Sequence, residues 1–74
     1  MKLFDLVTLL LDMPVEGLRR GATGAIVDLH GDPVEAYEVE FVDERGRTIA
    51  QLALRPEQIT LLRQNGAESD QGAQ

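Results

Sequence analysis

The chain has 74 residues, with seven Lys plus Arg against thirteen Asp plus Glu, no Cys and no Trp, and its formal net charge is −6. A chain of this length buries only about 60% of the surface that its unfolded form exposes, so it has room for one small core and no second domain. The acidic balance opposes binding to nucleic acid or to an anionic membrane surface. With one His and a single Ser, Ser69 near the C-terminus, the sequence lacks a rigidly held nucleophile and base.

The first apolar segment runs from Phe4 to Leu11 and stops at Asp12-Met13-Pro14. Its longest uninterrupted apolar run, Leu9 to Leu11, is far shorter than the ~20 residues of a membrane span. Asp5 and Asp12 break the apolar centre that a secretory signal requires, and the absence of Cys agrees with a cytoplasmic protein. We favour a strand over Val7–Leu11, with a short helix over Phe4–Leu11 as the alternative.

The next segment is rich in glycine. Val15 to Gly24 contains three Gly residues and is predicted to be a loop with positive-φ corners. Its Gly21-Ala22-Thr23-Gly24 stretch has the glycines of an anion cradle but lacks the Lys of a P-loop, so we interpret it as a bend in the chain. A second strand is predicted at Ala25–Leu29, before the turn at Gly31-Asp32-Pro33.

The clearest pattern is the alternation at Ala36–Val42, where Tyr37, Val39 and Phe41 are apolar and the residues between them are acidic. This period of two predicts a strand with one face in the core, Tyr37 and Phe41 included, and one face in solvent. The turn Asp43-Glu44-Arg45-Gly46, with Gly at the left-handed position, leads into a returning strand at Arg47–Leu54.

A 3₁₀ turn at Arg55–Gln58 and a closing strand at Ile59–Leu62 complete five predicted strands. Residues 64–74 are almost wholly polar and are predicted to form a disordered tail. The sequence therefore predicts an all-β protein in which residues 1–63 form a small five-stranded SH3-like barrel, because closure removes the exposed edges of a flat sheet. The alternative is a sheet with one N-terminal helix.

The stretches FDLVTLLLDMP, GLRRGATGAIVD, AYEVEFVDERGRT and LRPEQI, in this order, resemble a family of small bacterial proteins described only as a domain of unknown function. The resemblance covers residues 3 to 62 and is most specific where Leu18, Gly21 and Gly24 combine with the YEVEFVD strand. It implies the barrel and transfers no catalytic residue. The layout is also similar to SH3-like barrels that serve as small subunits beside catalytic partners, such as the nitrile hydratase β-subunit and the variable chain of ferredoxin-thioredoxin reductase.

Two groups of side chains have spacings that chemistry can use. Asp28, His30 and Asp32, with Glu35 as a possible fourth ligand, have the spacing of a strand-borne metal site, but a solvated hairpin end is the better interpretation. Glu38 and Glu40 lie on one face of a strand, where paired carboxylates serve glycoside hydrolysis only beside a sugar-sized cleft. We therefore expect no metal, no cofactor and no catalysis, and interpret the Glu38–Glu40 pair as a solvated face or a docking patch.

Ile49 and Gln51 are predicted on the second face of the fourth strand, which is mildly polar in a highly charged chain. Ile49 either contributes to a docking surface or is covered by Leu3 or Phe4. Salt bridges to Glu16, Asp43 or Glu44 are expected for the loop arginines, which are Arg19, Arg20, Arg45 and Arg47.

These patterns predict a small acidic protein that binds another protein, or a second copy of itself, through Glu38, Glu40, Ile49 and Gln51. One alternative is an antitoxin or immunity-type protein that neutralises a basic partner. Another is a barrel related to the KOW-type barrels of ribosomal and transcription proteins, which the acidic charge makes the weaker alternative.

Overall fold

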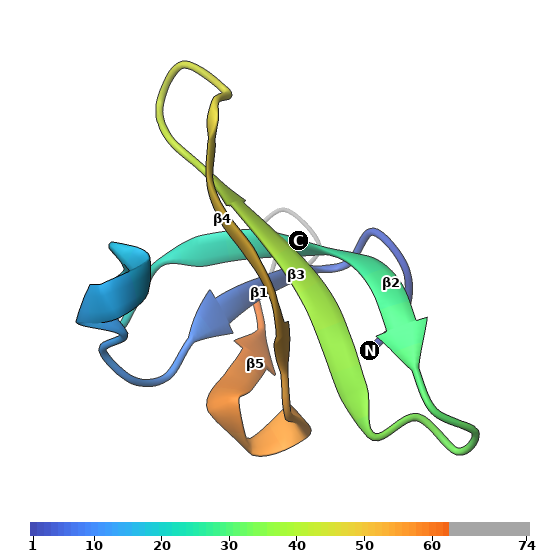
Figure 1. Cartoon of the computed structure of the whole chain (residues 1–74). Coiled ribbons are helices and arrows are strands. Elements are labelled where there is room, and N and C mark those ends of the chain that lie inside the picture. Colours follow the sequence, from blue (N-terminus) through green and yellow to red (C-terminus); the bar gives the residue numbers. More distant parts are fainter. Residues whose placement is uncertain (63–74) are drawn as a thin grey trace, which may run out of the picture.

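The computed structural model describes residues 1–62, in which five antiparallel strands form one sheet with the order β4-β3-β2-β1-β5. The strands are β1 (Leu6–Leu9), β2 (Thr23–His30), β3 (Ala36–Val42), β4 (Thr48–Leu54) and β5 (Ile59–Leu61), and two 3₁₀ turns, η1 (Pro14–Glu16) and η2 (Pro56–Gln58), precede β2 and β5. The sheet is strongly twisted, so that β3 and β4 run across the direction of β1 (Figure 1). Neither turn in this described part has the length or apolar character to cross a bilayer. The tail expected at residues 64–74 lies outside the described residues.

The all-β prediction is confirmed, and the alternative of an N-terminal helix is wrong. β1 pairs with two strands at once, since Val7 lies opposite Gly24 of β2 and opposite Leu61 of β5. A strand with ladder partners on both sides has its backbone N–H and C=O groups hydrogen-bonded. A short isolated helix is only marginally stable, so this apolar segment is more stable as a strand in the sheet.

Every strand contributes to the core. Phe41, expected in the core, is 1% exposed, and Tyr37 packs against the core while partly buried. Leu52 and Ala50 of β4 are also half-buried against it, as their alternation predicts. The buried residues are Val7, Leu9, Leu18, Ile26, Val39, Phe41, Leu54 and Ile59.

The strand boundaries follow from pairing as well as from side-chain pattern. β3 has its predicted bounds, Ala36–Val42. β1 ends at Leu9, two residues earlier than expected. Leu10 N donates to Gln58 O of η2, and the chain turns after that residue. β4, η2 and β5 differ from their predicted ranges by a single residue at one end each.

The glycine-rich segment is only partly a loop. It contains η1, and its last two residues, Thr23 and Gly24, already belong to β2. Gly17 and Gly21 have φ of 75° and 96°, the left-handed values expected at corners. Gly24 is different, because it is buried within the strand, so the interpretation of this residue as a bend is wrong.

Two bulges reorient side chains along the sheet. The β2–β3 register shifts between Ile26 and Asp28, which leaves Val27 as an extra residue. A bulge of one residue reverses the inward and outward alternation beyond it, and this bulge places Asp28 and His30 on the outer face of the sheet. The β3–β4 register shifts in the same way, with Ile49 as the extra residue.

Candidate functional site

The outer face of β2, β3 and β4 brings together most of the polar residues that the sequence singled out. Residues directly opposite in an antiparallel pair point to the same face. Glu38 lies opposite Asp28 of β2 and Ala53 of β4, and Glu40 lies opposite Gln51 of β4. We call the surface formed by Glu38, Glu40 and Gln51 the acidic face; Ile49, predicted to lie with them, is the extra residue of the β4 bulge and has no register partner that places it there.

Hydrogen bonds hold both carboxylates of the acidic face in place. His30 Nε2 lies 2.9 Å from Glu38 Oε1, and Gln51 Nε2 donates to Glu38 Oε2 at 3.3 Å. Thr48 Oγ1 donates to Glu40 Oε2 at 2.6 Å. Within residues 1–62, neither carboxylate forms a salt bridge with a Lys or Arg side chain. Both oriented carboxylates are half-buried, Glu38 has His30 as its ion-pair partner whenever the imidazole is protonated, and no Lys or Arg of residues 1–62 neutralises either.

Ile49 is 46% exposed at the bulge of β4. A Cβ atom placed on Gly17 would lie 3.8 Å from Ile49 Cγ2, so the loop after η1 is its neighbour on that side. Leu3 and Phe4, which the sequence offered as a cover, are themselves 43% and 76% exposed. Ile49 therefore retains an accessible apolar surface beside the loop after η1.

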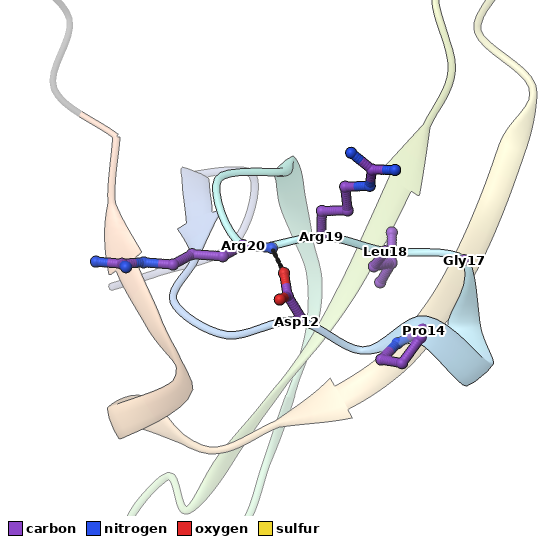
Figure 2. Close-up of a pocket in the computed structure, with 6 residues that line it drawn as sticks. All are labelled: Asp12, Pro14, Gly17, Leu18, Arg19 and Arg20. Atoms are coloured by element: carbon purple, nitrogen blue, oxygen red, sulfur yellow. Dashed lines mark hydrogen bonds between the residues drawn. The ribbon is translucent and has the colours of Figure 1, made fainter.

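A shallow depression of about 610 Å³ lies on the loop between β1 and β2 (Figure 2). Its lining residues are Asp12, Pro14, Gly17, Leu18, Arg19 and Arg20. Asp12 Oδ1 accepts a hydrogen bond from the backbone N–H of Arg20 at 2.8 Å, and the two arginine side chains diverge from it. Sequence reasoning missed this depression, because it depends on the Met13–Leu18 bridge that folds the loop back on itself.

Within residues 1–62, one of the four loop arginines forms its expected salt bridge. Arg47 Nε lies 3.0 Å from Asp43 Oδ2. Within residues 1–62, Arg19, Arg20 and Arg45 form no salt bridge, so the expectation for these three residues is wrong. On the same loop, the Asp12 carboxylate accepts a hydrogen bond from the backbone N–H of Arg20 and not from an arginine side chain.

Asp43 organises the β3–β4 hairpin. Its Oδ1 accepts hydrogen bonds from the backbone N–H groups of Arg45 at 2.8 Å and Arg47 at 3.0 Å. The backbone hydrogen bond from Arg47 is the main cause of a lowered pKa at Asp43. Gly46 has the expected left-handed φ of 80°. The Asp43 carboxylate thus bonds to residues of its own turn. The small depression lined by Asp43, Glu44, Arg45 and Arg47 is formed by the same hairpin.

The metal-site spacing does not produce a cluster. Asp28 Oδ1 accepts a hydrogen bond from Leu29 N at 2.8 Å, and His30 faces Glu38 across the strands. In the described part of the chain, no group of three or more His, Asp and Glu side chains is arranged to hold a metal ion.

Neither Glu38 nor Glu40 lines one of the two depressions above, and both already accept hydrogen bonds from neighbouring side chains. The acidic face is thus a separate feature from either depression.

The chain belongs to a family defined by a shared domain of unknown function. The domain of unknown function DUF4926 matches residues 3–61, a range that includes all five strands of the sheet. Comparison with curated proteins and with solved structures returned no match.

Proposed function

We propose that this protein is a small non-catalytic module that binds another protein through its acidic face. The observation that carries the proposal is the pair of oriented carboxylates, Glu38 and Glu40, beside a strand that contains no charged residue. Two carboxylates with no Lys or Arg partner within residues 1–62 attract a basic surface, and the exposed Ile49, beside the loop after η1, offers a separate apolar contact.

We further propose that the sheet is an SH3-like barrel in a bacterial, cytoplasmic protein, and that within residues 1–62 this barrel stays open between its edge strands β4 and β5. The strand order, with β1 between β2 and β5, and the 3₁₀ turn immediately before the last strand support the barrel. The resemblance of the sequence to a bacterial family supports the origin, and the cysteine-free composition supports the compartment.

The experiment is affinity capture from native lysate with three forms of the full chain, followed by identification of captured proteins. The forms are the wild type, Glu38→Gln/Glu40→Gln, and a control with the same loss of charge at exposed acids away from the face, Glu16→Gln/Glu44→Gln. We expect one stoichiometric partner on the wild type and the control, and its loss from the Glu38→Gln/Glu40→Gln variant. Equal capture by all three forms, or no capture by any, overturns the proposal.

A neutralising role, as in an antitoxin or immunity protein, is the second candidate. The same carboxylates fit the basic active site of a toxin as well as they fit an enzyme subunit. An adjacent reading frame for a basic toxin, and inhibition of its product by this protein, would support that role. An adjacent enzyme subunit that co-purifies with this protein supports the accessory role instead.

A further inference from the structure

β4 is an edge of the sheet, and within residues 1–62 its only ladder partner is β3. Edge strands present unpaired N–H and C=O groups, and proteins protect them with charged residues, Pro, bulges or short length. β4 has seven residues, Thr-Ile-Ala-Gln-Leu-Ala-Leu, with neither charge nor Pro, and its bulge lies at the N-terminal end. The opposite edge, β5, has only three residues. The β4 edge is thus the less protected of the two.

The hydrogen-bond pattern of the sheet shows which backbone groups of β4 point away from β3, towards the open edge, and it can be followed from β2. Ile26 N donates to Asp5 O at 3.0 Å, so the backbone groups of Ile26 point towards the N-terminal segment that leads into β1. Along a strand these groups alternate in direction, and those of Ala25 therefore point towards β3. Ala25 lies opposite Glu40, so the backbone groups of Glu40 point back towards β2.

The same alternation then passes across β3 to β4. Since the backbone groups of Glu40 face β2, those of Val39 face β4, where Val39 lies opposite Leu52. The groups of Leu52 therefore face β3, and those of Gln51 and Ala53 face the open side. Within residues 1–62, no backbone hydrogen bond from outside the β3–β4 ladder reaches Gln51 or Ala53. These two residues offer two N–H donors and two C=O acceptors in the spacing of a strand.

The side chains at this edge define the chemistry of an added strand. Gln51 and Ala53 point to the outer face, opposite Glu40 and Glu38, and both are exposed. Because the side chain of Ala53 is small, it leaves room for a side chain from the edge to reach Glu38 on β3. Lys and Arg lay their aliphatic stems along such a surface and place the charge at its end. A neighbouring strand with a basic residue on the outer face would bring its charge to the carboxylates.

We propose that the β4 edge receives an extended segment of a partner protein as an antiparallel sixth strand, with Lys or Arg at alternate positions on the acidic face. The inference rests on the proposed function and specifies how the partner binds. Backbone pairing with Gln51 and Ala53 supplies the affinity, and the basic side chains supply the selectivity. A second copy of this chain is the less suitable occupant, because its β4 brings no cation to Glu38 and Glu40 and its net charge is also −6.

The probe is a nine-residue peptide of alternating Lys and Val, titrated into the full chain and followed by NMR. Residues opposite Gln51 and Ala53 in an antiparallel pair share the outer face, so the Lys amides point at β4 and the Val amides point away. A peptide N-methylated at the Lys amides tests the backbone pairing, and a peptide N-methylated at the Val amides is its matched control. A peptide with Glu in place of Lys tests the charge.

We expect the Lys-Val peptide to slow amide hydrogen exchange at Gln51 and Ala53 by about tenfold or more. Methylation of the Lys amides should weaken binding by about tenfold or more, whereas methylation of the Val amides should leave the Kd within about threefold. The Glu peptide should not bind. The Ala53→Pro variant, which removes an N–H from the open side where an edge strand tolerates Pro, should lose binding while keeping the melting profile of a folded chain. If Ala53→Pro does not fold, the two methylated peptides on the wild type decide the question.

Three results overturn strand addition. Equal binding of both methylated peptides, without protection of Gln51 and Ala53, would put the peptide on the acidic face and leave the proposed function intact. A dimer of the free protein that Ala53→Pro dissociates would make a second copy the occupant. No binding of the Lys-Val peptide at low ionic strength excludes a basic strand. Failure of the proposed function is seen separately, as equal lysate capture by the wild type and the Glu38→Gln/Glu40→Gln variant.

Discussion

Gly24 is a residue whose importance comes from its neighbours. It lies buried in β2, and a Cβ there would be 2.6 Å from Val39 Cγ1 and 2.9 Å from both the carbonyl oxygen of Glu40 and Phe41 Cδ1. These contacts are closer than packed atoms allow, and one of them is backbone, which has little room to move. The absent side chain lets β2 and β3 approach over the core, and the backbone φ of Gly24 is not left-handed.

Gly24→Ala should therefore destabilise the protein by about 1–3 kcal/mol, since inserting a methyl group into a packed site forces side-chain and backbone shifts. The free energy of unfolding from urea titration measures the effect. Thr23→Ala, at the exposed neighbouring position, is the control and should remain within about 0.5 kcal/mol of the wild type. Equal stability of Gly24→Ala and Thr23→Ala would contradict the close approach.

At the scale of elements, the β3–β4 hairpin is closed by one carboxylate. Asp43 accepts two backbone hydrogen bonds and pairs with Arg47, and its pKa is lowered mainly by the backbone hydrogen bond from Arg47. A group with a lowered pKa in the folded state stabilises that state above its unfolded pKa, about 3.9 for Asp, and loses the contribution as the pH falls through the folded value.

Asp43→Asn should therefore melt at a lower temperature than the wild type at pH 7. The difference should shrink as the pH falls from about 4 through the lowered pKa of Asp43, because the wild-type carboxylate then becomes neutral as well. Thermal melts at a series of pH values measure this. Glu44→Gln, one residue along the same hairpin, should show no such pH-dependent difference, and a constant difference for Asp43→Asn would contradict the role of the charge.

The edge strand gives a second expectation at this scale. In the free protein, the amides of Ala50 and Leu52 bond to β3, whereas those of Gln51 and Ala53 face the open side. Native-state hydrogen exchange should show slow exchange at Leu52 and fast exchange at Gln51 and Ala53. Slow exchange at Ala53 in a monomeric sample would mean that the edge is covered, and no strand could then be added there.

At the scale of the whole molecule, one small core carries the stability of the fold. Leu9 and Ile26 are fully buried at the centre of a single cluster to which every strand contributes. A domain of this size has no second core to compensate for a loss, and the net stability of native proteins is only about 5–15 kcal/mol, with small domains towards the lower end. Single core substitutions therefore remove a large fraction of the total.

Leu9→Ala should lower the free energy of unfolding by about 2–5 kcal/mol, and Ile26→Val by about 0.5–1.5 kcal/mol. Urea titration should show lower midpoints with an unchanged slope. Leu61→Ala, at a residue that is 47% exposed on β5, is the control and should have a smaller effect than Leu9→Ala. Equal effects of the two Leu→Ala changes would contradict the placement of the core.

The predictions from the sequence were most accurate for the features that depend on side-chain pattern alone. The period of two at Ala36–Val42 predicted β3 with its observed bounds, and Gly46 was expected at the left-handed position of the following turn. Glu38 and Glu40 were placed on one face for the same reason. These features depend on the alternation of residues near each other in the chain, because successive side chains of a strand point to opposite faces.

The remaining features depend on contacts between segments far apart in the chain. The bulge at Val27, which turns Asp28 and His30 to the acidic face, arises from the register between β2 and β3. The close approach at Gly24 and the open edge of β4 depend on which strands become neighbours. Local patterning therefore determined that there are strands and which of their faces are apolar. Pairing in three dimensions decided which carboxylates stand together and which backbone groups remain available, because both depend on partners that no local window of sequence contains.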